Sequence, residues 1–195
     1  MIPMNLTLRQ GWVALRLLVV MTVLLGIGYP FAMFAVGRIV AGSSNGSYVT
    51  NSSGAVVGSS LIGQTFDGDK WFWPRPSAAG DGYDALSSSG SNLAADNPDL
   101  VKAVGERQAA AAAANGVQPG DVPADAVTAS GSGLDPDISP EYARQQVARV
   151  AAARGADIAQ VSALVDGATQ GRLLGFLGEP RVNVLQLNLA LEKLG

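Results

Sequence analysis

The chain has 195 residues, with 13 basic and 16 acidic side chains and neither Cys nor His. The lack of Cys excludes disulfides, zinc–thiolate sites and thiol nucleophiles, and the lack of His excludes a Ser-His-Asp triad and the commonest general base. Sixteen acidic but only ten basic residues follow residue 66, a net charge of −6 that argues against nucleic-acid binding.

Residues 17–37 form an uncharged, largely apolar segment of 21 residues. A helix that crosses the roughly 30 Å apolar core of a bilayer needs about 20 such residues. The alternative is a signal peptide cleaved near Val40-Ala41-Gly42, but the apolar core of a signal peptide is only about 7–15 residues long. We therefore expect residues 1–42 to contain a retained transmembrane helix, kinked at Pro30.

Three small residues in this segment, Gly28, Ala32 and Ala35, are spaced i, i+4 and i+7, which places them on one helix face. A face of small side chains lets a second helix approach closely. Small residues are also common throughout this chain, so the spacing can arise without a partner. Both interpretations stay open at this point.

The basic residues around the apolar segment predict its orientation. Arg9 and Arg16 precede it, whereas no Lys or Arg follows Arg38 until Lys70. Because cytoplasmic flanks carry an excess of Lys and Arg, we expect a cytoplasmic N-terminus and an extracytoplasmic domain over residues 43–195.

The extracytoplasmic part begins with a predicted linker and a hairpin. Residues 42–47 are Gly, Ser and Asn, as in a short linker. Residues 48–50 and 55–57 are β-prone and flank a Gly-containing turn, which predicts two antiparallel strands. We expect residues 60–62 to extend the second strand.

An aromatic and Pro-rich segment, WFWPRP, occupies residues 71–76 and cannot form a regular helix. We expect its aromatic side chains to fill the core beneath a loop. The alternative is a contact surface formed by Trp71, Trp73 and Arg75, since Trp and Arg are typical interface anchors.

Capping residues mark three helices in the remainder. Asn97-Pro98 begins one that we expect to run to about residue 114, and Ser139-Pro140 begins another that ends near Arg154. Asp157 caps a third helix with an apolar face. Residues 181–183 are expected to form a short strand, followed by a C-terminal helix. The predicted fold class is α+β: one N-terminal transmembrane helix and a single mixed domain.

No catalytic constellation and no metal site are found. Residues 130–133 (SGSG) lack the Lys and hydroxyl residue that end a phosphate-binding loop. Asp135, Asp137 and Glu141 surround a helix start, where carboxylates usually act as caps, and they lack EF-hand spacing. The residues alone thus indicate a membrane-tethered binding or structural domain.

Several longer motifs resemble the C subunit of the bacterial Kdp potassium-transporting P-type ATPase. After an apolar helix that ends in YPF (29–31), the chain contains GSSLIGQTF (58–66), FWPRPSA (72–78), GSNLAADNP (90–98), VTASGSGLDPDISP (127–140) and GEPRVNVLQLNLALEKL (178–194). The matches run nearly the whole length. Two positions depart from the usual pattern: Asp84 follows Tyr83 where Asn is common, and Ser89 stands where Gly is common.

This resemblance implies a non-catalytic accessory subunit in the bacterial inner membrane, with no cofactor of its own. Its implied partners are a channel-like potassium-translocating subunit, a P-type ATPase subunit and a small single-span subunit. The family is described as an assembly factor and as a catalytic chaperone that raises the ATPase subunit's affinity for ATP. Its middle loop resembles the signature of ABC-type nucleotide-binding domains. In this chain the corresponding candidate ATP contacts are Ser88, Ser89, Gly90, Ser91 and Asn92.

We expect the domain to cap the outer mouth of the channel-like subunit. An alternative hypothesis is a membrane-tethered regulator that binds nucleotide through the Gly- and Ser-rich loops at 87–92 and 130–133. A third is an extracytoplasmic envelope domain unrelated to transport.

Overall fold

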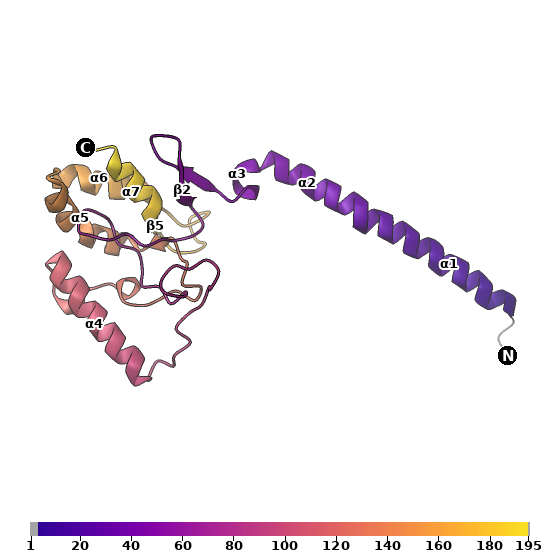
Figure 1. The fold of residues 1–195 in the computed structure, drawn as a ribbon, viewed down its shortest axis with the longest axis horizontal. Coiled ribbons are helices and arrows are strands. Elements are labelled where there is room, and N and C mark those ends of the chain that lie inside the picture. The colour runs from indigo at the N-terminus through magenta and orange to yellow at the C-terminus, as the bar shows by residue number, and fades with distance from the viewer. Residues whose placement is uncertain (1–3, 195) are drawn as a thin grey trace. The chain divides into compact units, whose positions relative to one another are not determined.

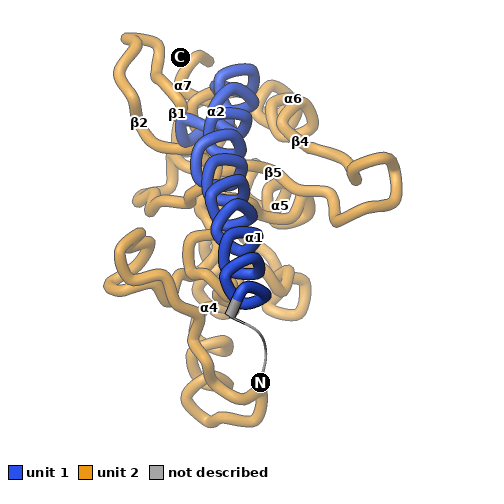
Figure 2. The backbone as a smooth tube through the Cα atoms, turned by 90° about the vertical axis from the view of Figure 1, so that its right-hand side faces the viewer, with its two compact units in different colours: residues 1–47 blue, residues 48–195 orange. Residues whose placement is uncertain are grey.

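A computed structural model of the chain describes residues 4–194. It contains two compact units, Met1–Ser47 and Tyr48–Gly195, which are coloured separately in Figure 2. The fold class predicted from the sequence is confirmed: one long apolar helix precedes a domain of mixed helices and strands (Figure 1).

The first unit is a long helix with no buried side chains along its apolar stretch. It consists of α1 (Met4–Val23), a π-helical segment η1 (Leu24–Gly28) and α2 (Tyr29–Ile39), and is followed by the short α3 (Ala41–Ser44). Asn5–Ile39 spans 35 residues, with a mean hydropathy of 2.2 in its most apolar window. A rise of 1.5 Å per residue makes it longer than a bilayer core is thick. The helix is therefore long and apolar enough to cross a membrane.

The π-helical segment ends two residues before Pro30. A proline has no N–H and its ring crowds the preceding turn. The helix widens here instead of ending: the backbone N–H of Tyr29 donates to the carbonyl of Leu24, five residues back. Such local adjustments satisfy the groups that proline would otherwise leave unpaired in a membrane helix.

The predicted linker at 42–47 is partly helical. Residues 41–44 form α3, and the Ser44 hydroxyl donates to the carbonyl of Gly37 at 2.7 Å. This side-chain bond gives the small Gly and Ser residues a helical turn that their composition did not predict.

The second unit begins with the predicted hairpin, β1 (Tyr48–Thr50) paired antiparallel with β2 (Val56–Ser59). The Asn51 side chain holds the turn by accepting bonds from the backbone of Ser53 and Ala55. The predicted extension through residues 60–62 is wrong. Ser59 ends the strand because its hydroxyl and its carbonyl accept the backbone N–H groups of Leu61 and Ile62, which closes a turn.

A second, three-stranded sheet has β5 (Arg181–Asn183) at its centre. β3 (Asp137–Ile138) and β4 (Thr169–Gln170) pair with it on either side, both antiparallel. β5 is the strand predicted from the sequence, whereas β3 and β4 are two-residue strands that no periodicity marked. The bounds of the remaining elements are α4 (Pro98–Asn115), η2 (Pro119–Asp121), η3 (Ala124–Ala126), α5 (Pro140–Arg154), α6 (Ile158–Ala168) and α7 (Val184–Glu192).

The predicted helix starts are confirmed by their caps. The side chains of Asn97, Ser139 and Asp157 accept backbone N–H groups in the first turns of α4, α5 and α6. Gly116 and Gly155 adopt the left-handed conformation that ends α4 and α5. These boundaries were predictable because each depends on only a few neighbouring residues.

The core of the second unit lies where α5, α6 and α7 gather around β5 (Figure 1). Phe72 is fully buried and belongs to the same hydrophobic cluster as buried residues of all these elements. The expectation that the aromatic segment fills the core is confirmed for Phe72.

Candidate functional site

The two Gly- and Ser-rich loops noted in the sequence lie against each other. The Ser132 carbonyl accepts two bonds from the other loop, from the Ser88 hydroxyl at 2.9 Å and from the Ser89 backbone N–H at 3.0 Å. The Ser77 hydroxyl donates to the carbonyl of Gly133 at 2.6 Å. Donors that would contact a phosphate in a nucleotide loop are therefore directed at the neighbouring chain segment.

Two glycines in this region are required by close backbone approach. A Cβ on Gly133, whose φ is +66°, would lie 2.6 Å from the Ser89 carbonyl oxygen and 2.7 Å from the Ala79 nitrogen. A Cβ on Gly63 would lie 2.6 Å from the carbonyl oxygen of Asp135. The Gly-rich composition thus serves loop–loop packing.

The remaining ATP candidates lie on the same loop. Gly90 lies beside Gly131, whose carbonyl oxygen would be 3.1 Å from an added Cβ. Ser91 and Asn92 are exposed, and Asn92 has a left-handed backbone with φ of +53°.

An ion pair joins the aromatic segment to the second loop. One terminal nitrogen of Arg75, Nη1, lies 2.8 Å from Asp135 Oδ2, and both side chains are largely buried. The phenol of Tyr83 donates to the Arg75 carbonyl at 2.8 Å. Burial, assisted by the nearby Asp135 carboxylate, raises the pKa of Tyr83 well above its ordinary value of 10.0, so the phenol stays protonated.

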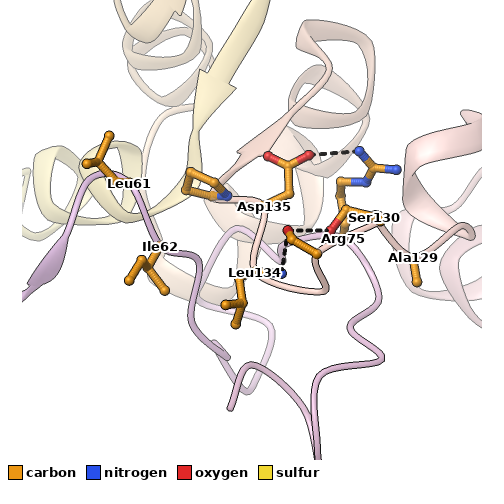
Figure 3. Close-up of a pocket in the computed structure, with 10 residues that line it drawn as sticks. Leu61, Ile62, Arg75, Ala129, Ser130, Leu134 and Asp135 are labelled. Carbon is orange, nitrogen blue, oxygen red and sulfur yellow. Dashed lines mark hydrogen bonds and ion pairs between the residues drawn. The ribbon is translucent and has the colours of Figure 1, made fainter. Parts of the chain in front are cut away.

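A hollow of about 650 Å³ opens beside this ion pair. The aliphatic side chains of Leu61, Ile62 and Leu134 line it together with Arg75 and Asp135 (Figure 3). Within residues 4–194, Arg75 Nε is buried without a hydrogen-bond acceptor. The hollow therefore presents apolar contact surface beside a partly buried ion pair, as a docking site for an extended protein segment would.

A second hollow, of about 460 Å³, shares Arg75 and Asp135 and adds three more acidic side chains. All three of these carboxylates already have partners, Glu179 through its ion pair with Arg172. Asp125 accepts the backbone N–H and the hydroxyl of Ser139, and Asp137 pairs with Arg181 at 3.0 Å. No set of three acidic side chains with metal-binding geometry occurs in the described part of the chain.

Burial raises the pKa of Asp137 above its ordinary value. A hydrogen bond from Asn183 and the charge of Arg181 partly oppose this effect. Its ionised form is therefore less favourable in the folded protein than in water.

The backbone of the aromatic segment is held by two buried amide side chains. Gln146 accepts from the Trp73 N–H at 2.7 Å and donates to the Trp73 carbonyl at 3.2 Å. Asn188 makes the same pair of bonds with Phe72, at 2.9 and 3.0 Å. Both amides are at most 1% exposed. They provide the bonds that a neighbouring strand would otherwise supply.

Arg149 is a nearly buried cation in the centre of this network. It donates to Asn115 Oδ1, to the carbonyls of Asp69 and Trp71, and to Gln146 Oε1 at 2.7–3.0 Å. Its guanidinium also stacks on the Trp73 ring, 3.7 Å from the centroid. Burial lowers the pKa of Arg149, although an arginine remains charged at neutral pH.

The Trp side chains predicted as interface anchors are partly buried by these contacts. Trp71 packs against Phe66 with ring centroids 5.9 Å apart and lies beneath the cationic ends of Lys70 and Arg154. The Trp73 indole N–H donates to the Gly68 carbonyl at 3.0 Å. Of the three anchors, Arg75 is the one that lines the hollow.

Arg149, Gln146 and Asn188 were not among the residues predicted from the sequence. A pattern did mark the first two: Tyr142, Gln146 and Arg149 are spaced i, i+4 and i+7, and all three are buried. When two polar residues share a helix face with an aromatic residue, the pattern indicates a buried polar network.

The predicted helix-packing residues lie in the first unit. Gly28 is the last residue of the π-helical segment, and Ala32 and Ala35 follow in α2. All three are exposed. Since the α-helical spacing begins at Gly28, the three remain on one face despite the wider turn before them.

The family described as KdpC: K+-transporting ATPase, c chain, matches residues 11–193. The potassium-transporting ATPase KdpC subunit of Kineococcus radiotolerans is 61% identical over 185 residues, which is 95% of this chain and 94% of the relative. The corresponding proteins of Mycobacterium tuberculosis H37Rv and Caulobacter sp. strain K31 are 52% and 53% identical. These matches cover 95% and 88% of this chain, and 99% and 87% of the two relatives.

Proposed function

The chain belongs to the KdpC family of K+-transporting ATPase subunits, and we propose that its helix binds the channel-like potassium-translocating subunit while its second unit covers the outer potassium entrance. In this proposal it is a non-catalytic accessory subunit, assembled with the P-type ATPase subunit and the small single-span subunit. The observation that carries the proposal is the match over residues 11–193, which includes both the membrane helix and the domain.

The small face of the helix supports binding to a neighbouring membrane helix. Gly28, Ala32 and Ala35 are exposed, and a helix that packs there can approach more closely than at the Leu- and Val-rich faces. Apolar burial drives association weakly inside a bilayer, so close packing at small residues has to supply most of the affinity.

The flanking charges support an outward orientation of the domain. Arg9 and Arg16 lie at the start of the helix, and the segment after Arg38 has no basic residue until Lys70. Replacement of Leu86, which is 98% exposed, by Cys gives a single reactive thiol in a chain without Cys. We expect this Cys to react with a maleimide that cannot cross the inner membrane. The cells stay intact, and only their outer layers are made permeable to the reagent. Labelling only after lysis would reverse the orientation.

The hollow beside Arg75 supports a docking role for the domain. Leu61 and Ile62 line it and are 63% and 40% exposed, so both offer apolar surface to a partner. We expect Ile62→Asp to weaken co-purification of the channel-like subunit. Val56→Asp is the matched control, because Val56 lies on the strand β2 that precedes Ile62, is 61% exposed and does not line the hollow.

The domain's net negative charge is compatible with a position at a cation entrance. Sixteen acidic and ten basic residues follow residue 66, and their net negative charge raises the local concentration of cations. Salt screens this effect beyond about 8–10 Å. An outward domain reaches cytoplasmic ATP only indirectly. The proposed rise in the ATP affinity of the ATPase subunit would therefore pass through the membrane helix, and removing the subunit should raise the KM for ATP of the remaining complex.

Assembly through the small face is tested by Ala32→Trp. Met33 lies one residue on and about 100° further round the helix, so Met33→Trp places the same indole side chain on another face. In cells that lack their own copy of the subunit, the wild-type chain and Met33→Trp should support growth on limiting potassium and co-purify the other subunits. Ala32→Trp should do neither. Equal behaviour of the two variants would show that the helix is only a tether, and unimpaired growth without the chain would refute the proposed function.

A further inference from the structure

A projecting loop of the second unit carries an exposed apolar tip that the proposed function does not use. Residues 171–180 connect β4 to β5, and we call them the finger. Leu173, Leu174, Phe176 and Leu177 lie within five positions and are 69%, 76%, 68% and 47% exposed. Figure 2 shows this loop extending away from the body of the unit. Clustered large apolar side chains that stay in water mark a contact surface.

The tip is an ordered turn and not a loose loop. Leu173 and Leu177 exchange two backbone hydrogen bonds of 2.9 Å, and the Gly175 N–H donates to the Arg172 carbonyl at 3.1 Å. Leu174 has a φ of +55°, a conformation that a leucine adopts only where its surroundings impose it. The turn therefore holds a strained leucine outward, and its main chain is largely satisfied by its own bonds.

The charges of the finger are confined to its base. No ionisable side chain occurs between Leu173 and Gly178, and Arg172 and Glu179 pair with each other at 2.6 Å. Insertion of the tip into an apolar environment would thus bury no unpaired charge and few unpaired main-chain groups.

The connection to the long helix limits how far the second unit can lie from the bilayer. Eight residues separate Ile39, at the end of the long helix, from Tyr48, at the start of the second unit, and a fully extended chain of that length spans at most about 29 Å. A unit of this size has a radius of gyration of about 15 Å. Its surface therefore stays close to the membrane on whichever side it lies.

We propose that the finger is a membrane-contacting element, whose Leu and Phe side chains enter the interfacial layer of the bilayer that anchors the chain. A convex, uncharged apolar turn fits a deformable lipid surface. Contact at a second point would restrict the tilt and rotation of the unit more than a single connection to the helix does. The proposal does not depend on the orientation of the chain or on any partner subunit.

The test uses the absence of Cys from the sequence. Leu174→Cys and the control Leu86→Cys are each labelled with an environment-sensitive fluorophore on the full chain, reconstituted in nanodiscs alone and within the assembled complex. Both positions are exposed, so neither label disturbs the core. Lipids carrying a nitroxide near the headgroup should quench the label at 174 several-fold more than the label at 86. Aqueous iodide should show the reverse preference.

Two outcomes would overturn the proposal. Equal quenching of both labels by iodide would leave the finger in water, and protection of position 174 from both quenchers would assign it to a protein partner. Because the measurement on the chain alone needs no other subunit, it can fail while the proposed function stands, and the loss of assembly in Ala32→Trp would leave its result unchanged.

Discussion

Replacement of Arg149 by Ala tests whether the aromatic segment is held by the buried guanidinium. The change removes four hydrogen bonds and the stacking contact with Trp73, and leaves the acceptors of Asn115, Asp69 and Trp71 without this donor. Hydrogen bonds to a charged group contribute about 1.5–3 kcal/mol each, but removal also relieves the desolvation of the cation. We expect a net loss of about 3–5 kcal/mol.

Thermal unfolding of the full chain in detergent, followed by near-UV circular dichroism, measures this loss. A domain of this size loses about 2–4 °C of Tm per kcal/mol, so Arg149→Ala should unfold about 6–20 °C lower than the wild type. Arg144→Ala is the matched control on the same helix. Its ion pair with Asp166 is 3.0 Å long but 55–60% exposed, and such pairs contribute less than about 1 kcal/mol.

The Lys variant separates charge from geometry. A single ammonium group cannot replace a planar fork that reaches four acceptors, so Arg149→Lys should recover less than half of the lost Tm. Full recovery by Lys, or a Tm for Arg149→Ala within the range of the Arg144→Ala control, would refute the assignment of a structural role to this guanidinium.

Two further predictions concern the loops and the small sheet. Gly133→Ala should cost about 2–4 kcal/mol in chemical denaturation because its Cβ would meet the other loop in a left-handed backbone, whereas Gly131→Ala, with open space around it, should stay within about 1 kcal/mol of the wild type. Equal losses would remove the case for close loop packing. Because burial raises the pKa of Asp137 above 3.8 in the folded state, its contribution to stability should fall as the pH rises from that value through the raised pKa. Asp137→Asn should flatten the dependence of the unfolding free energy on pH in this window, and an unchanged slope would contradict the effect.

Helix ends were predictable from the sequence because each depends on a few neighbouring residues. Asn97, Ser139 and Asp157 cap α4, α5 and α6, as their positions before Pro or an apolar run had indicated. The failures were also local. The Ser59 hydroxyl closes a turn where β-prone residues predicted a strand, and Ser44 extends a helical turn into the expected linker. In both cases a side-chain bond to the backbone outweighed weak propensity.

The candidate site was predictable only in its parts. The sequence marked Arg75, the aromatic segment and both Gly- and Ser-rich loops. Their hydrogen-bond partners, however, lie far away along the chain: 44 positions for Ser88–Ser132 and 116 positions for Phe72–Asn188. No local pattern specifies such pairings. β3 and β4 were missed for the same reason, since two-residue strands exist only because β5 lies between them.

The two loops also show why a Gly- and Ser-rich segment is ambiguous by itself. Glycine lets a backbone approach a phosphate, and it equally lets one backbone approach another. At Gly133 the nearby atoms are the carbonyl oxygen of Ser89 and the nitrogen of Ala79, so the missing side chain makes room for the protein's own main chain. The hydroxyls of Ser77 and Ser88 donate across the same contact. A nucleotide phosphate at Ser88 and Ser89 would have to displace these hydrogen bonds. The pairing of the loops therefore stabilises the wall of the hollow and disfavours phosphate binding at these two residues.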